Sequence, residues 1–139
     1  MAIISMDFGN IGGGTETSTV LWSNSSTSSD FAGQTITLND DITNYDYIEL
    51  KWKYYKTDAD TNATSLRIPT ADFIAVGTYS TQNKNRYIIG SQRGSNNFMA
   101  RTFCYESNTS IKFDVNYYIA TTGSANSQSI PISISGIKI

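Results

Sequence analysis

The stretch Tyr45–Lys56, YDYIELKWKYYK, decides the fold of this chain. Its apolar and aromatic residues fall on every second position: Ile48, Leu50, Trp52 and Tyr54. The positions between them carry polar or charged side chains: Tyr47, Glu49, Lys51 and Lys53. Because successive side chains of a strand point to opposite faces, this alternation predicts a strand with one buried and one solvated face. We expect it at the centre of the core, since burying each apolar side chain contributes about 1.5–3 kcal/mol.

The rest of the chain predicts further short strands, and no segment has the period of an amphipathic helix. The predicted strands cover residues 19–23, 34–38, 63–69, 73–79, 86–93, 98–106, 110–119 and 130–139. Several apolar residues within them should share the buried face: Ile36, Leu38, Ile111, Phe113 and Val115. Turn-forming residues separate the strands at intervals of about ten residues. The sequence therefore predicts an antiparallel, jelly-roll-like β-sandwich of about nine strands without significant helix.

The last predicted strand, residues 130–139, changes its phase along its length. Three isoleucines share one face at its start: Ile130, Ile132 and Ile134. Two more follow in the opposite phase: Ile137 and Ile139. Gly136 stands between the two sets, and a phase change at a glycine is typical of a β-bulge. Pro131 lacks a backbone N–H, so we expect it at the start of the strand or on a sheet edge.

Composition excludes several classes of function. The 139 residues suit a single domain, and the formal net charge of −2 lacks the cationic excess of nucleic-acid binders. No apolar run is long enough to insert into a membrane. Histidine, the commonest general base and metal ligand, is absent, and Cys104 is the only cysteine. We therefore expect no enzyme activity, no cofactor and no metal, and we interpret Cys104 as a small buried side chain.

Residues 1–18 are predicted to lie outside the sandwich, which we assign to residues 19–139. Apolar side chains come first: Ile3, Ile4, Met6 and Phe8. The glycines that follow interrupt any regular structure and indicate a flexible tether. This segment is either a frayed terminus or a peptide that attaches the domain to another protein, and we predict attachment.

One turn imitates the opening of a calcium-binding loop. Asp58, Asp60 and Asn62 occupy the right positions, but Ala63 and Pro69 stand where glycine and glutamate are required. We therefore interpret the segment as an ordinary turn. The sequence also lacks an acidic pair of the kind that hydrolyses glycosidic bonds.

Two groups of side chains leave alternatives open. Tyr45, Tyr47 and Tyr55 lie on the predicted wet side of their strand, where aromatics stack on sugars, fill a subunit interface or lie under a second layer. Four cations surround one predicted hairpin: Lys84, Arg86, Arg93 and Arg101. We interpret these cations as solvated charges that protect strand edges from aggregation.

Three stretches resemble β-sandwich modules of tailed bacteriophages. They are LWSNSSTSSDFAGQTITL (Leu21–Leu38), YDYIELKWKYYK (Tyr45–Lys56) and IPISISGIKI (Ile130–Ile139). Such modules occur in tail fibres and minor structural proteins and carry no catalytic signature. The resemblance implies a non-enzymatic protein of the phage particle surface, bound to other virion proteins and assembled as a homo-oligomer, commonly a trimer. The alternatives are a capsid decoration or head-fibre protein without a ligand, and a bacterial carbohydrate-binding module.

If consecutive strands alternate in direction, the loops sort onto two ends of the sandwich. The end that holds the tether, the near end, should carry loops 39–44, 70–72, 94–97 and 121–129. The opposite, far end should carry loops 24–30, 58–62, 80–85 and 107–109. The far loops are rich in side chains that bind sugar hydroxyls, so we expect contact with a host-surface glycan there. The candidate binding residues are Asn24, Asp30, Asp58, Asp60, Asn62, Asn83, Lys84, Asn85 and Asn108.

Overall fold

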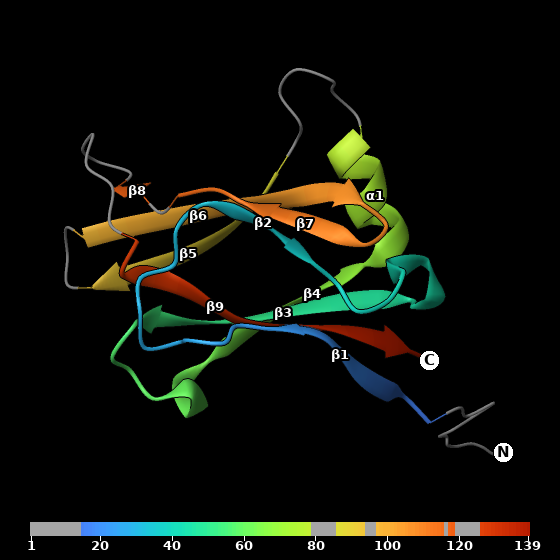
Figure 1. Ribbon diagram of the computed structural model, residues 1–139, viewed down its shortest axis with the longest axis horizontal. Coiled ribbons are helices and arrows are strands. Elements are labelled where there is room, and N and C mark those ends of the chain that lie inside the picture. Colours follow the sequence, from blue (N-terminus) through green and yellow to red (C-terminus); the bar gives the residue numbers. More distant parts are fainter. Residues whose placement is uncertain (1–14, 79–85, 94–96, 116, 119–125) are drawn as a thin grey trace, which may run out of the picture.

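The computed structural model describes residues 15–78, 86–93, 97–115, 117–118 and 126–139, which form two antiparallel sheets packed face to face (Figure 1). The first sheet has the order β1 (Thr17–Ser23), β9 (Gln128–Lys138), β3 (Tyr47–Tyr55), β4 (Thr64–Pro69). The second has the order β2 (Gln34–Thr37), β7 (Ser110–Phe113), β6 (Asn97–Ser107), β5 (Tyr87–Arg93), and the two-residue strand β8 (Tyr117–Tyr118) pairs with β6. Two short 3-10 turns and one helix complete the described chain: η1 (Ile42–Asn44), η2 (Asp60–Asn62) and α1 (Thr70–Thr78).

The predicted antiparallel sandwich is confirmed. Eight strands of four residues or more lie within the described ranges, so the prediction of nine counted one too many unless β8 is included. Early strands pair with late ones, β1 with β9 and β2 with β7, which is the nesting of a jelly roll. β3 and β4 depart from that nesting, because these two consecutive strands pair with each other as a hairpin. β3 therefore lies between β9 and β4.

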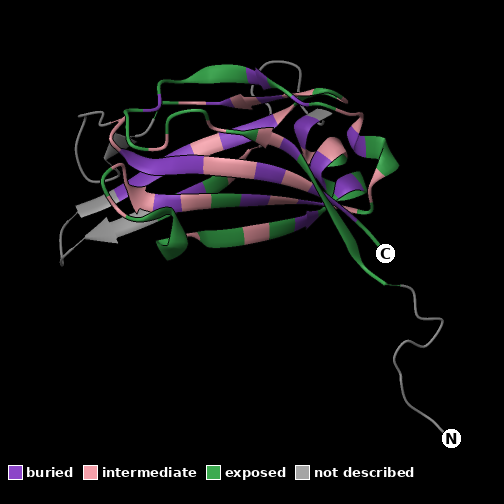
Figure 2. Cartoon of the chain, turned by 60° about the horizontal axis from the view of Figure 1, so that its bottom comes forward, coloured by how far each residue is buried: buried purple, intermediate pink, exposed green. Residues whose placement is uncertain are grey.

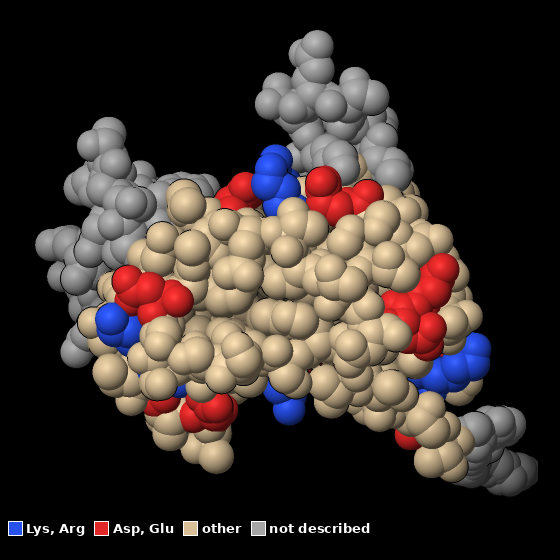
Figure 3. All heavy atoms as spheres, viewed as in Figure 1, with Lys and Arg blue, Asp and Glu red and all other residues tan. Residues whose placement is uncertain are grey.

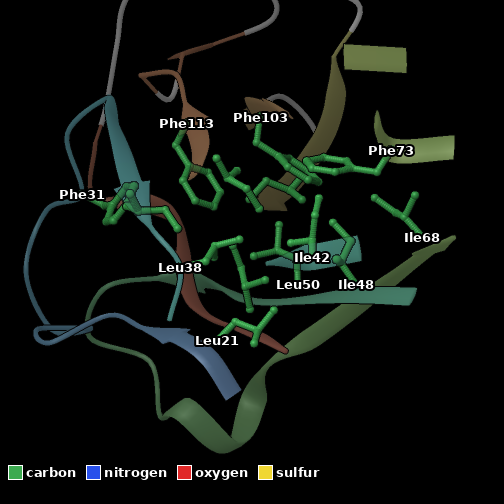
Figure 4. Close-up of a cluster of buried hydrophobic side chains, with 14 of the residues drawn as sticks. Leu21, Phe31, Leu38, Ile42, Ile48, Leu50, Ile68, Phe73, Phe103 and Phe113 are labelled. Carbon is green, nitrogen blue, oxygen red and sulfur yellow. The ribbon is translucent and has the colours of Figure 1, made fainter. Parts of the chain in front are cut away.

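The core lies between the sheets, and β3 is central to it as predicted. Ile48 and Leu50 are each 1% exposed, and they face Phe103 and Phe113 from the second sheet (Figure 4). Buried residues alternate with half-buried or exposed ones along the first half of β3, from Tyr47 to Lys51 (Figure 2). The period-two pattern therefore located the core-facing side chains of β3 correctly up to its midpoint.

Of residues 73–79, predicted as a strand, residues 73–78 are helical, and residue 79 lies outside the described residues. The helix α1 covers residues 70–78, so the predicted loop 70–72 is its first turn and the expectation of no significant helix is wrong. Phe73 is fully buried, with its ring 6.0 Å from that of Phe103 and 5.8 Å from that of Tyr87. The apolar run is too short for its period to separate helix from strand. The helix forms because it buries Phe73 at the end of the sandwich.

Replacing a strand by a helix reverses the predicted direction of every later strand. The near end is where β1 begins and β9 ends, since Thr17 pairs with Lys138. Loop 107–109 lies at this end, because the backbone N–H of Ile42 donates to the Asn108 carbonyl at 2.9 Å and that of Leu38 to the Thr109 carbonyl at 2.8 Å. Its predicted position at the far end is therefore wrong.

The described parts of two loops predicted for the near end, residues 126–129 and residue 97, lie at the far end instead. The Asn126 carbonyl accepts from the backbone N–H of Phe31 at 2.8 Å, and the Ser127 carbonyl accepts from Lys56 at 3.0 Å. β5 ends and β6 begins at the far end as well, where Arg93 pairs with Asn97 (Figure 1). Both errors have the same cause. A helix stands where a strand was predicted, so every later strand runs opposite to its predicted direction.

The bulge in β9 lies at Ile132 rather than at Gly136. Lys51 pairs with Ser133 and Trp52 pairs with Pro131, which leaves Ile132 as the extra residue. Gly136 pairs regularly, but a Cβ there would lie 2.4 Å from Cγ of Tyr45, so glycine is required by the tyrosine ring. Pro131 is the fourth residue of β9 and lies beside the bulge, beyond the last residue of β1. At this point β9 pairs with β3 but not with β1, which agrees with the predicted position near the strand's start or on an edge.

The strand predicted over residues 110–119 is interrupted. β7 ends at Phe113, and the pairing of β8 resumes at Tyr117. Ile111 and Phe113 are fully buried as predicted, whereas Val115 is 46% exposed because it follows the end of the strand. Cys104 is buried as predicted, with its Sγ 3.8 Å from a guanidinium nitrogen of Arg86.

Candidate functional site

The far end brings together the two predicted polar loops that follow β1 and β3. The Thr27 hydroxyl donates to Oδ2 of Asp60 at 3.0 Å, and Nζ of Lys56 forms an ion pair with Asp30 at 2.8 Å. Asn24 ties this region to the sheet, because its Nδ2 donates to the Pro131 carbonyl at 2.9 Å. The structure therefore places five predicted residues at one end of the sandwich: Asn24, Asp30, Asp58, Asp60 and Asn62.

Lys53 lies beneath this end of the sandwich. It was predicted on the solvated face of its strand, but it is only 2% exposed. Its Nζ donates to the Asp58 carbonyl and to Oδ1 of Asp60, both at 2.8 Å. The hydrogen bond from Lys53 is the main cause that holds the pKa of Asp60 below its ordinary value, and the Thr27 hydroxyl adds to it against the effect of burial. Burial of Lys53 follows from the turn at 58–62, which folds back over the end of β3.

Protein groups bind both acids of this turn, as in an ordinary turn: Lys53 donates to the Asp60 carboxylate, and the backbone N–H of Tyr55 donates to Oδ2 of Asp58 at 3.1 Å. Within the ranges that the structure describes, no three His, Cys, Asp or Glu side chains come close enough to hold a metal ion. In the same ranges no helix is long and apolar enough to cross a lipid bilayer.

A hollow of about 420 Å³ opens beside this turn on the outer face of the first sheet. Its polar lining comes from Lys51, Asp60, Thr61, Thr64, Ser65 and Ser133. Ser65 and Ser133 flank Lys51 in register on the neighbouring strands β4 and β9. Four hydroxyls with one ammonium and one carboxylate supply the donors and acceptors that a sugar's hydroxyl groups require.

Sequence reasoning included Asp60 but missed the other polar residues of this hollow. The signal was present, because Ser65, Lys51 and Ser133 fall in the outward-facing phase of three predicted strands. What the sequence could not provide was the pairing of β3 with both β4 and β9, which puts these residues in one row.

The remaining predicted residues do not join this site. Asn108 lies at the near end, where its Oδ1 accepts from the Tyr105 hydroxyl at 2.7 Å. Three candidates of loop 80–85 lie outside the described residues: Asn83, Lys84 and Asn85. The same is true of the predicted attachment residues: Ile3, Ile4, Met6 and Phe8.

The three tyrosines have different surroundings. The ring of Tyr45 packs against the core over Gly136, and its hydroxyl donates to Asp40 at 2.9 Å, a contact that raises the pKa of Tyr45. This is the predicted case of a tyrosine covered by the protein itself. The ring centroid of Tyr47 lies 5.8 Å from the guanidinium carbon of Arg67. Tyr55 is half-buried. Sugar stacking and interface contact remain predictions for Tyr47 and Tyr55.

Arg101 is fully buried, so its prediction as a solvated charge is wrong. Its guanidinium donates to three backbone carbonyls: Ser129 at 2.9 Å, Asp114 at 2.7 Å and Gln128 at 3.2 Å. The charge lies 5.1 Å from the ring centroid of Phe31, and desolvation lowers the pKa of Arg101 to about 10. The side chain therefore stays charged at neutral pH and ties β6 to the start of β9 across the two sheets.

A sequence signal for this burial existed. Met99, Arg101 and Phe103 occupy alternate positions of β6, so the arginine falls in the apolar phase. Of the other cations in its group, Arg86 is 29% exposed and pairs with Asp114, while Lys84 and the side chain of Arg93 lie outside the described residues. Figure 3 shows the charged side chains in small mixed groups around a mostly uncharged face.

No protein-family model matches this chain, and no curated protein has a significantly similar sequence. The function therefore has to be inferred from the geometry of the sandwich and its far end.

Proposed function

We propose that the protein is a non-enzymatic structural component of a bacteriophage particle, a tail-fibre or receptor-binding appendage that displays its sandwich outward. The observation that carries the proposal is the separation of its two ends. β1 begins and β9 ends at the near end, whereas the polar loops after β1 and β3 lie at the far end. A domain held through its N-terminal segment would therefore present these loops away from the particle. The three phage-like sequence stretches support the same function.

The proposed ligand is a host-surface glycan bound at the far end. The hydroxyl-lined hollow around Lys51 and Asp60 supports this choice, because its side chains match the hydrogen-bonding groups of a neutral sugar. The far-end acids favour binding over hydrolysis, since Asp60 is paired with Lys53 and Asp30 with Lys56. We further propose a homo-oligomer on the particle, as is common for phage appendages.

Purified particles test the attachment. The full chain, carrying a C-terminal tag, should co-purify with intact particles, and deletion of residues 1–14 should abolish co-purification while the thermal midpoint of the sandwich stays unchanged. A shortened chain that still co-purifies would contradict attachment through this segment. A full chain that never associates with particles but binds glycans would identify a free carbohydrate-binding module instead.

Host adsorption tests the far end. The double variant Lys51→Ala/Thr64→Ala removes one ammonium and one hydroxyl from the hollow without touching the core, and it should reduce adsorption of the particles. The matched control is Lys138→Ala at the near end, which should adsorb normally. Unchanged adsorption by the far-end variant, in particles with normal protein content, would favour a decoration protein that has no ligand.

A further inference from the structure

A second, larger hollow lies on the outer face of the other sheet, at the junction of β2, β7 and β6. Its volume is about 620 Å³, within the range of small-molecule sites. The polar side chains around it are Gln34, Thr35, Arg86, Thr102, Lys112 and Asp114. We propose that this hollow binds a monoanionic sugar unit, a hexuronic acid of a host-surface glycan. The inference deepens the proposed function, because it rests on the sandwich being a glycan-recognition module.

The register of three strands builds the hollow. Lys112 of β7 pairs with Thr35 of β2 on one side and with Cys104 of β6 on the other. Gly33 closes one wall at very short range, since a Cβ there would lie 2.9 Å from the backbone nitrogen of Val115. Any larger residue at position 33 would push the end of β7 outward and change the shape of the hollow.

Asp114 is held from both its backbone and its side chain. Its carbonyl accepts from the buried Arg101 at 2.7 Å, while Oδ2 accepts from Arg86 at 2.5 Å and from the Thr102 hydroxyl. Within the described chain its other carboxylate oxygen, Oδ1, carries no hydrogen bond and is a fixed acceptor for a ligand hydroxyl. A group held in this way loses little conformational entropy when a ligand binds.

The lining carries an excess of one positive charge. Arg86 and Lys112 contribute two cations against the one carboxylate of Asp114. Arg86 is engaged by Asp114, whereas the Lys112 ammonium has no hydrogen bond or ion pair to any residue that the structure describes. The side chains of this hollow therefore have a positive net charge, whereas the whole chain has a formal net charge of −2. Lys112 is therefore the group available to pair with an anion.

The remaining chemistry selects the kind of anion. A phosphate dianion would meet the carboxylate of Asp114 within the same hollow, which opposes the second negative charge. A neutral sugar would leave the Lys112 ammonium without a counter-charge. A ring that carries one carboxylate and several hydroxyls uses both parts of the lining, the ammonium for its charge and Asp114, Thr35 and Gln34 for its hydroxyls.

Titration of the ¹⁵N-labelled full chain with sodium glucuronate tests this inference by two-dimensional NMR. We expect saturable shifts of the amides of residues 33–35, 102 and 112–114, with glucose and acetate each weaker by about tenfold or more, because each lacks half of the contacts. Inorganic phosphate should also bind more weakly. Equal affinities for glucuronate and glucose, or shifts centred elsewhere, would overturn the proposal.

Lys112→Gln keeps the length and polarity of the side chain but removes its charge, and it should weaken glucuronate binding by about tenfold. The matched control, Lys138→Gln, changes an exposed lysine at the near end that lines neither hollow, and it should bind glucuronate as the wild type does. Unchanged binding by Lys112→Gln, with an unchanged thermal midpoint, would overturn the assignment of this residue and the proposal with it.

The outcome separates this inference from the proposed function. Particles that contain the protein and adsorb through its far end, together with a chain that does not bind glucuronate, would overturn the inference alone. Glucuronate binding by a chain that never associates with particles would overturn the virion function and support the ligand.

Discussion

At the near end of the sandwich, α1 closes the space between the sheets with the ring of Phe73, whereas at the far end the guanidinium of Arg101 spans them. Phe73 packs against the aromatic rings of Tyr87, Phe103 and Tyr105. Arg101 instead donates to three named carbonyls of β9 and of the segment after β7. Both residues are fully buried, so the two ends are equally dry but are held by different interactions.

The difference shows what each end is suited to do. Burial of apolar side chains is non-directional and tolerates small shifts, which suits the end through which we propose that the protein is attached. Hydrogen bonds from a buried cation have a defined direction, and they fix the backbone of Asp114 and the start of β9. The far end therefore has a backbone fixed by directional contacts beside the hollow that Asp114 lines, which suits the glycan contact that we propose there.

The largest expected effect comes from breaking the near end. Phe73→Ala should lower the free energy of unfolding by about 3–5 kcal/mol, because it leaves a ring-sized cavity between the sheets. Urea denaturation measures it, with the exposed Ile88→Ala as a control that should change stability by less than about 0.5 kcal/mol. A similar small loss for both variants would show that α1 does not close the core.

Breaking the far end should cost somewhat less. Arg101→Gln leaves up to three buried carbonyls without their charged donor and should destabilise the fold by about 3 kcal/mol. Unlike Phe73→Ala, it should also shift the amides of residues 114 and 128–129 in the folded protein. The surface variant Arg67→Gln is the control and should leave the unfolding midpoint unchanged within error. A stable Arg101→Gln chain with unshifted amides would contradict the role of the buried cation.

A substitution at Gly136 tests how closely the ring of Tyr45 packs at the near end. Gly136→Ala should destabilise the protein by about 1–3 kcal/mol, because the new methyl group would lie 2.4 Å from Cγ of the tyrosine ring. Adding Tyr45→Ala should recover part of this loss by making room, and differential scanning calorimetry of the three variants measures the coupling. If the double variant is no better than the sum of the single ones, the ring is not the obstacle.

The smallest expected effect comes from removing the charge of Asp60, which forms an ion pair with Lys53. The folded-state pKa of Asp60 lies below its ordinary value of about 4, so its stabilising contribution is complete above that pH and is lost as the pH falls through the lower folded pKa. Because Asp60 is half exposed, Asp60→Asn should cost less than about 1 kcal/mol at neutral pH. Denaturation curves between pH 2 and 6 should fall less steeply for Asp60→Asn than for the wild type. Parallel curves would contradict this pairing.

The pattern of the sequence was sufficient for most strands but not for their arrangement. Ile48 and Leu50 were placed correctly because burial of one face depends only on local alternation. Residues 73–79 were misassigned, because a short apolar run fits either structure until it is known which surface it covers. That one error moved residue 97, loop 107–109 and residues 126–129 to the wrong ends, so Asn108 was assigned to a site that it does not share.

The sequence by itself determined the all-β class, the central strand and a polar far end that contains Asp58, Asp60 and the loop after β1. Only the tertiary structure decided that Lys53 and Arg101 are buried, because a charged side chain enters the interior only where carbonyls or carboxylates meet it. For Lys53 these groups come from the turn that folds back over β3, and for Arg101 they come from distant segments. The same holds for the two hollows. Each is lined by residues of neighbouring strands, and strand pairing is a long-range choice that alternation along one strand cannot specify.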